Sequence, residues 1–224
     1  AFLPDHDDLR RAITDRTRLV MLCTPNNPTG PSLSTDQVED FLARVPDHVV
    51  VAIDEAYREF HDPATVLGTA GIFRRHGNVV LLRTFSKLQG LAGLRLGYAV
   101  AHPRLAQALG QVAIPFAASS PAQVAALASL RPEVQEELAR RAEWVRSERS
   151  RVMRALAEQG WELPQSQGNF VYFPVGEQAS AFAEFADARG LVLRAYGVDG
   201  VRATIGEQEA NDLLIEIGAA WREH

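Results

Sequence analysis

The chain has 224 residues, of which 46% are hydrophobic and 23% charged, which supports one large domain or two smaller ones. Its formal net charge is −5 and it has no run rich in Lys or Arg, so a nucleic-acid partner is not expected. No apolar run reaches the ~18 residues of a membrane helix, so no membrane partner is expected either. Cys23 is the only cysteine, which rules out an intrachain disulfide, and we expect a cytoplasmic protein.

The N-terminal quarter is predicted to alternate between helix and strand. Residues 7–15 have the pattern of a short helix, and the apolar run 18–23 has the length of a buried strand. Dense turn residues end that run. Ser34 and Gln37 have the spacing of a capping box, which predicts a helix with an apolar face, and residues 49–54 are predicted as a second strand.

Two further apolar runs, residues 78–84 and 95–101, predict a third and a fourth strand. The segment between them is rich in glycine and holds a single lysine, Lys87. Strands that are apolar throughout and alternate with helices are typical of a mainly parallel sheet covered on both faces. The sequence therefore predicts an α/β fold in which all four strands are buried.

After residue 102 the pattern changes to α+β. The expected elements, in order, are a connector over 114–123, a long helix through Val134, Leu138, Ala142, Val145, Val152 and Leu156, a strand over 169–174, a helix around Phe182 and Phe185, short strands over 191–194 and 201–205, and a last helix through Trp221. We therefore predict one domain over residues 1–115 and a second over 116–224.

Three polar motifs follow the ends of the first three predicted strands. TPNNPTG comes after the first strand, DEAY begins with Asp54 at the end of the second, and TFSK follows the third. Ligands of open parallel sheets bind beyond the carboxyl ends of the strands. We expect one edge of the sheet to bring these motifs together.

Taken singly, the polar residues have ordinary structural interpretations. Asp54 alone would be a helix cap, Tyr57 a packing aromatic, Lys87 a solvated charge and Arg95 an ion-pair partner. Cys23 is interpreted as a core residue rather than a nucleophile. The six histidines lack the spacing of metal ligands, so no metal site is predicted.

Taken together, the same residue types form a specific chemical set. A partly desolvated lysine can form a Schiff base, and an aspartate can keep a pyridine nitrogen protonated. A tyrosine and an asparagine can bond a phenolic oxygen, while two hydroxyls and an arginine can hold a phosphate. This set fits pyridoxal phosphate (PLP) and very little else.

The motifs TPNNPTG, DEAYREF and TFSKLQGLAGLRLGY resemble those of the fold-type I PLP aminotransferases, in the branch of the histidinol-phosphate and aromatic amino acid enzymes. Their order and spacing match from about residue 7 to the C-terminus. The resemblance implies a partial PLP-transferase-like large domain over 1–115. It also implies a C-terminal α+β small domain over 116–224 that includes the long linking helix.

The resemblance implies a role for each residue around the cofactor ring. Lys87 would bind PLP as a Schiff base and move a proton between the substrate and the cofactor. Asp54 would pair with the pyridinium nitrogen, and Tyr57 and Asn27 would bond the phenolic oxygen.

Residues further from the ring are assigned in the same way. Thr84, Ser86 and Arg95 would hold the phosphate. The residues implied to contact the substrate are Arg202, which would capture its acidic group, Arg194, a second basic residue, and Asn169.

The chain begins AFLPDHDD, without an initiator Met or a signal segment, and we expect it to lack the N-terminal part of the family. In family members that part holds a phosphate-binding turn, an aromatic that stacks on the cofactor and a tyrosine lent to the partner subunit. We therefore expect a homodimer for the whole enzyme. We expect this chain alone to bind PLP weakly or not at all and to be inactive.

The short loop between Arg194 and Arg202 looks more like the phenylalanine or aromatic aminotransferases than the histidinol-phosphate enzymes. We therefore expect amino transfer between an aromatic amino acid and 2-oxoglutarate, with histidinol-phosphate aminotransferase as the alternative. A PLP decarboxylase or lyase of the same fold, and an aminotransferase-like sensor domain fused to a DNA-binding module, also stay open.

Overall fold

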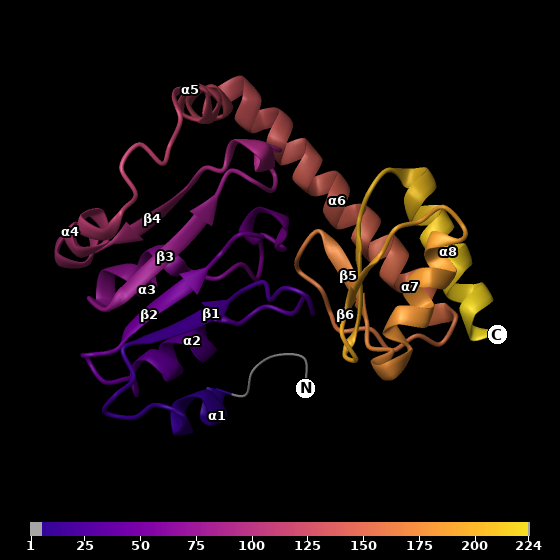
Figure 1. Ribbon diagram of the computed structural model, residues 1–224, viewed down its shortest axis with the longest axis horizontal. Helices are drawn as coiled ribbons and strands as arrows, with labels where there is room; N and C mark the ends of the chain where they lie inside the picture. The colour runs from indigo at the N-terminus through magenta and orange to yellow at the C-terminus, as the bar shows by residue number, and fades with distance from the viewer. Residues whose placement is uncertain (1–5, 224) are drawn as a thin grey trace.

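The computed structural model of the chain describes residues 6–223 as two sheets connected by one long helix (Figure 1). The elements are α1 (His6–Arg11), β1 (Leu19–Cys23), α2 (Thr35–Leu42), β2 (Val50–Asp54), the 3₁₀ helix η1 (Arg58–Phe60), α3 (Thr69–Arg75), β3 (Val79–Thr84), η2 (Ala92–Leu94), β4 (Gly97–Ala101), α4 (Pro103–Val112), α5 (Ser120–Ser129), α6 (Pro132–Glu158), β5 (Phe170–Phe173), η3 (Gly176–Gln178), α7 (Ala179–Asp187), β6 (Arg194–Tyr196), β7 (Gly200–Thr204) and α8 (Gln208–Arg222).

The first sheet has the strand order β1-β2-β3-β4. β1, β2 and β3 pair in parallel, and β4 pairs antiparallel with β3. The register aligns Cys23 with Asp54, and Asp54 with Leu82, so the three parallel strands end at one edge. The predicted α/β fold with a mainly parallel sheet is confirmed.

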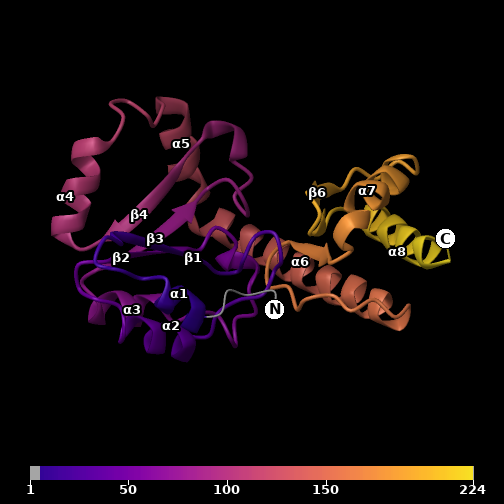
Figure 2. The same cartoon turned by 60° about the horizontal axis from the view of Figure 1, so that its bottom comes forward.

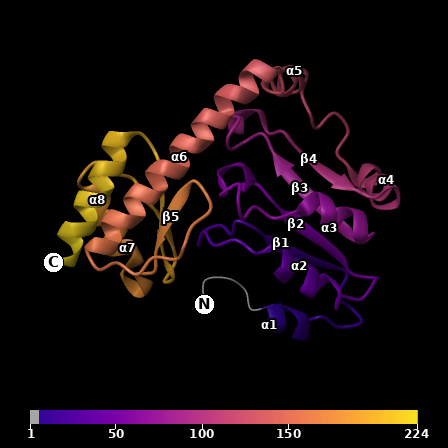
Figure 3. The same ribbon diagram turned by 180° about the vertical axis from the view of Figure 1, so that it is seen from behind.

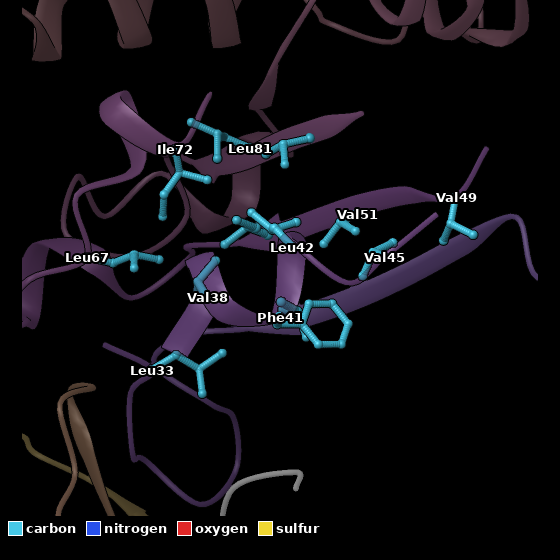
Figure 4. Packing of buried hydrophobic residues seen from close by; sticks show 13 residues of the cluster. Leu33, Val38, Phe41, Leu42, Val45, Val49, Val51, Leu67, Ile72 and Leu81 are labelled. Carbon is cyan, nitrogen blue, oxygen red and sulfur yellow. The ribbon is translucent and has the colours of Figure 1, made fainter. Parts of the chain in front are cut away.

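The core of this half lies between the sheet and the helices on one of its faces. The capping box predicted for α2 is present, because the Ser34 side chain accepts from the Gln37 amide and the Gln37 side chain accepts from the Ser34 amide. Figure 4 shows how the buried side chains of α2 meet those of α3 and the strands. The residues labelled there are Leu33, Val38, Phe41, Leu42, Val45, Val49, Val51, Leu67, Ile72 and Leu81.

The expectation that both faces of the sheet are covered is wrong for the described residues. Helices α1, α2 and α3 all lie on the same side of the sheet (Figure 2). Right-handed crossovers between strands that follow one another across a sheet place their helices on one face, which explains this arrangement. On β1, Leu19 and Met21 alternate onto the other face and are 54% and 62% exposed.

The expectation that the fourth strand is buried is also wrong. In β4, Tyr98 and Val100 are exposed, although their neighbours on β3 are buried or half-buried. β4 is the edge strand of the four-stranded sheet, so no further strand of the described chain covers its outer side. An apolar strand sequence therefore did not imply burial here.

The second half contains the antiparallel sheet β5-β7-β6 with α7, α8 and the C-terminal part of α6. Figures 1 and 3 show α6 running from the first half to the second. The aromatic core of this half includes Phe173, Phe182 and Trp161. Among the described residues, no helix is both long enough and apolar enough to span a membrane.

Several predicted boundaries differ from the structure; the fourth strand, for example, begins at Gly97 rather than at residue 95. The first helix ends at Arg11 rather than at residue 15, and a turn follows in which the Thr14 amide donates to the Thr17 hydroxyl. The connector predicted to residue 123 ends sooner, because the Ser119 side chain caps α5. The strand predicted over 191–194 is displaced to β6, since Leu191 and Leu193 pack against the core instead. The domain limits at 115 and 116 remain a prediction.

The open face of the first sheet predicts self-association of this chain. Exposed apolar patches drive association in water, so the purified chain should bind an apolar fluorescent dye and elute larger than a monomer. Met21→Lys should reduce both signals, because it places a charge on the face. Val192→Lys is the matched control, since Val192 is 82% exposed but belongs to the other half. A monomeric chain without dye binding would contradict this prediction.

Candidate active site at the carboxyl edge of the sheet

Asp54 stands at the end of β2, where the parallel strands finish. Its Oδ1 accepts from the Ala56 amide at 3.0 Å, and its carbonyl accepts from the Thr24 amide at 2.9 Å. These bonds fix the backbone on both sides of the carboxylate. On the neighbouring strand the register partner is Cys23, so a thiol and a carboxylate lie side by side at this edge.

The turn after β1 is compact and packed against the second half of the chain. The Gly30 amide donates to the Asn26 carbonyl at 2.7 Å, and the Asn26 amide donates to the Pro31 carbonyl at 2.8 Å. Gly30 has φ +98°, and a Cβ there would lie 2.5 Å from the Ser166 hydroxyl oxygen. Only glycine therefore permits this backbone angle and this close approach.

The same turn presents Asn27 to the second sheet. Asn27 Oδ1 accepts from Arg202 Nη1 at 2.6 Å, and the Tyr196 hydroxyl lies 3.4 Å from the same oxygen. Arg194 is the register partner of Arg202 across β6 and β7, so the two cations share one face of that sheet. A side-chain contact thus links residues far apart in sequence at the junction of the two halves.

Lys87 and Tyr57 lie together on the first half. Lys87 Nζ is 4.9 Å from the centroid of the Tyr57 ring, within range of a cation–π contact. Tyr57 is buried and meets Phe170 edge-on, with ring centroids 5.0 Å apart. The Arg202 guanidinium carbon is 5.2 Å from the Phe170 ring centroid, so a continuous set of contacts runs from Lys87 to Arg202.

The three residues predicted to bind phosphate lie at the end of β3 and in the segment that follows it. Thr84 Oγ1 accepts from the Ser86 amide at 3.0 Å, which folds the chain back just before Lys87. Arg95 has the left-handed angles φ 55° and ψ 47° and donates to the Ala92 carbonyl at 2.7 Å. Arg95 is exposed, and its described bond stays within its own loop. The structure therefore brings Thr84 and Ser86 together, but no described contact joins Arg95 to them.

Directly behind Asp54, a buried ion-pair cluster supports the edge. Glu55 is 1% exposed, and its two carboxylate oxygens accept from Arg58 Nη1 and Arg83 Nε at 2.7 Å each. Arg58 also donates to the Leu67 carbonyl at 2.7 Å. Removing one partner of such a buried pair costs about 3–5 kcal/mol, because a charge is left unpaired. Glu55 thus ties the end of β2 to β3.

Sequence reasoning did not identify several residues that contact the candidate site. Phe170 and Tyr196 each touch a predicted site residue, and Glu55 and Arg83 brace it from behind. Their positions in the sequence are a weak indication of such a role, since Phe170 follows Asn169 and Tyr196 lies two positions after Arg194. Asn169 is itself placed by its backbone, because its carbonyl accepts from the Ile205 amide at 2.9 Å.

One polar atom at the junction lacks a protein partner. Among the described residues, Arg202 Nε is buried and makes no hydrogen bond, although Nη1 of the same guanidinium binds Asn27. A buried donor of this kind is costly unless something accepts from it. The guanidinium is therefore suited to an added acceptor such as a carboxylate. No cluster of potential metal ligands occurs in the part of the chain that the structure describes.

The chain is similar in sequence to a large family of enzymes. The family model "Aminotransferase class I and II" matches residues 1–216. An aromatic amino acid aminotransferase of Rhodococcus opacus (strain B4) is 52% identical over 94% of this chain and 58% of its own length. An aromatic amino acid aminotransferase of Streptomyces coelicolor is 48% identical over 98% of this chain and 60% of its own length. The chain thus spans about three fifths of the length of these curated relatives.

Solved structures of related enzymes superpose on the chain. A histidinol-phosphate aminotransferase from Sinorhizobium meliloti, in complex with pyridoxal-5′-phosphate, has a TM-score of 0.85 and 29% identity over 98% of this chain and 63% of its own. A decarboxylase from Sulfurospirillum multivorans has a TM-score of 0.83 and 25% identity, over 97% and 65%. Enzymes of both names therefore share the two-sheet arrangement described above.

The thiol beside Asp54 gives a test of the edge geometry. Burial raises the pKa of Cys23, the Asn27 amide lowers it, and the negative charge of Asp54 raises it further. Because the thiolate is the reactive form, labelling of the folded chain should rise at higher pH than labelling of the unfolded chain. Asp54→Asn should lower the Cys23 pKa and shift the profile toward lower pH.

Asp199→Asn, which changes a carboxylate in the second half, is the control and should leave the profile in place. Identical profiles for the parent chain and Asp54→Asn would mean that the two side chains are not adjacent. The measurement is the labelling rate against pH, and Cys23 is the only thiol in the chain.

Proposed function

The chain belongs to the class I and II aminotransferase family, and we propose that the whole protein containing it transfers an amino group between an aromatic amino acid and 2-oxoglutarate. The observation that supports this most directly is the set of contacts that runs from Lys87 through Tyr57 and Phe170 to Arg202. It places an amine at one end and an anion-binding guanidinium at the other. The names of the curated relatives support the aromatic substrate class.

Family membership implies dependence on PLP, and the residues present fit that cofactor. The candidate site combines an amine on Lys87, a carboxylate on Asp54 and a phenol on Tyr57 around one sheet edge. We infer that Lys87 carries PLP, that Asp54 faces the pyridine nitrogen, and that Tyr57 and Asn27 bond the phenolic oxygen. Bound PLP supplies an electron sink for the charge that develops at the substrate α-carbon.

The phosphate is assigned to the loop after β3. Thr84 and Ser86 supply hydroxyls, with the Ser86 amide already bonded to Thr84 Oγ1, and Arg95 supplies a cation. Arg95 would have to exchange its bond to the Ala92 carbonyl for the phosphate. A phosphate is the stronger acceptor for Arg95, because it is negatively charged and can accept two parallel N–H bonds from one guanidinium.

In the proposed reaction the chain's own residues bind the substrate and move its proton. Arg202 would bind the substrate carboxylate through Nε, while Nη1 keeps its bond to Asn27. Arg202 would thereby fix the substrate α-carbon near the Lys87 amine. The Lys87 amine would take the proton from the α-carbon and pass it to the cofactor. The Asp54 carboxylate would pair with the ring nitrogen of bound PLP. Asn169 is proposed to line the substrate side.

Histidinol phosphate is the second candidate donor, and one observation favours it. Arg194 lies across from Arg202 in the strand pair, so two guanidinium groups share a face. Two cations suit a phosphorylated substrate better than an apolar ring. Against this, the Arg202 guanidinium carbon lies 5.2 Å from the Phe170 ring centroid and 5.8 Å from that of Tyr196. Aromatic rings around Arg202 suit a substrate with an aromatic side chain.

We also propose that the whole protein is a homodimer acting on small-molecule substrates. The open face of the first sheet and exposed β4 leave apolar surface that further protein is needed to cover. The candidate site lies at the junction of the two halves, and segments of a partner subunit that cover the apolar surface would complete it. Light scattering on the active protein measures this directly.

Covalent trapping tests the assignment of Lys87. The whole protein, incubated with PLP and reduced with borohydride, should carry one cofactor on the peptide that contains Lys87. Lys87→Ala should lose both the label and the activity. Asp54→Asn should keep the label but lose most of kcat, because an amide cannot hold the ring nitrogen protonated. A label on another lysine would overturn the assignment.

Donor kinetics test the substrate class. With 2-oxoglutarate as acceptor, kcat/KM should be at least about tenfold higher for phenylalanine than for histidinol phosphate, equivalent to about 1.4 kcal/mol in transition-state binding. Arg194→Leu should change the value for phenylalanine little and should lower the value for histidinol phosphate. The opposite order of donors would favour the second candidate, and release of CO₂ without amino transfer would favour a decarboxylase.

A further inference from the structure

Arg149 is a buried cation in the middle of α6. It is 5% exposed, and its guanidinium donates only to uncharged oxygens in the described structure. Nη1 donates to the Phe60 carbonyl at 2.9 Å and to the Gly168 carbonyl at 2.6 Å. Nη2 lies 3.3 Å from Gln167 Oε1. Among the described residues, no carboxylate forms an ion pair with it.

These acceptors come from two different parts of the proposed site. Phe60 ends η1, and its amide donates to the Tyr57 carbonyl at 3.1 Å, so it belongs to the turn that carries the proposed cofactor tyrosine. Gly168 directly precedes Asn169, the residue proposed to line the substrate side. One nitrogen atom therefore bonds both segments and fixes the distance between them.

The segment before β5 is held at a second point as well. Gln167 Oε1 also accepts from the Asp62 amide at 3.1 Å, and the Gln167 amide donates to the Gly30 carbonyl at 2.8 Å. Ser166 packs against Gly30 with no room for a side chain between them. The turn that carries Asn27 and the turn that carries Tyr57 thus meet the same short segment.

A neighbouring arginine shows that this arrangement is specific to Arg149. Arg146, one turn earlier on α6, donates to the Glu59 carbonyl at 3.1 Å and pairs with Glu143, so it reaches only the cofactor side. Arg151, further along, pairs with Glu148 and Asp212 and has no described bond to the first half. Only Arg149, of the three, bonds both sides.

Burial without a carboxylate partner is also costly. It lowers the pKa of Arg149 to about 10, and the nearby charge of Arg146 acts in the same direction. A guanidinium is poorly replaced here, because its planar fork meets three acceptors at once while a lysine offers a single nitrogen.

We propose that Arg149 is a positioning residue, which sets the separation between the cofactor-side turn at Tyr57–Phe60 and the substrate-side segment at Gln167–Asn169. This inference rests on the proposed function for its kinetic consequence but not for its structural one. Phe170 directly follows the substrate-side segment and begins β5, and Arg202 is held beside β5 because it pairs with Tyr172, so the placement of both relative to Lys87 depends on this segment.

Hydrogen exchange on the 224-residue chain tests the structural part. Arg149→Met should raise exchange of the Gln167 and Asp62 amides about tenfold or more and leave β3 and α8 protected. Arg149→Lys should give an intermediate increase. Arg151→Met, on the same helix, is the matched control and should leave both junction segments unchanged. Unchanged exchange in Arg149→Met would overturn the proposal, as would a uniform increase in Arg149→Lys across the whole chain.

Kinetics of the whole protein test the functional part. Arg149→Met and Arg149→Lys should raise KM for the amino donor about tenfold, with the Kd for PLP changed less than about twofold. A general loss of structure would weaken PLP binding as well. Loss of PLP binding in both variants, or an unchanged KM, would overturn the positioning role. If the parent protein shows no amino transfer, the proposed function fails while the exchange result still decides the role of Arg149.

Discussion

Parallel pairing of β1, β2 and β3 is the constraint on which the candidate site depends. Because the strands run the same way and their ends are in register, the segments that leave them emerge at one edge. The turn with Asn27, the carboxylate of Asp54 and the loop with Lys87 are adjacent for this reason. None of them needs to be near another in the sequence, since the backbone ladder alone places them.

A buried charge cluster makes that edge rigid from behind. Asp54 and Glu55 are consecutive, so their side chains point to opposite faces of the sheet. The Asp54 carboxylate is the one proposed to face the cofactor, and the Glu55 carboxylate pairs with Arg58 and Arg83. The arginine of β3 is followed directly by Thr84, so the same ion pair that holds Glu55 also aligns the loop after β3. The proposed cofactor-binding carboxylate and the carboxylate that anchors the strand end are therefore neighbours in the sequence.

Local patterns allowed much of the fold and many of the site motifs to be predicted from sequence. Ser34 and Gln37 defined a helix start because capping depends only on nearby atoms, and Asp54 and Lys87 stood out because strand ends can be located along the chain. Burial of a sheet face does not follow from the strand's own sequence, because it depends on what packs there rather than on the strand. Met21 is apolar yet exposed for this reason. The bonds of Arg149 and Tyr196 join distant segments, and nothing in their local sequence specifies the partner.

The length of α6 has a mechanical consequence. Its 27 residues extend for about 40 Å, so the helix acts as a stiff rod shared by both sheets. Arg149 lies nearer the C-terminal end of this helix, which continues for nine more residues after it. Because one continuous helix supplies side chains to both halves, a tilt of the helix against either sheet would move the two halves relative to one another. Arg149 opposes such a tilt, since its guanidinium bonds Phe60 of the first half and Gly168 of the second.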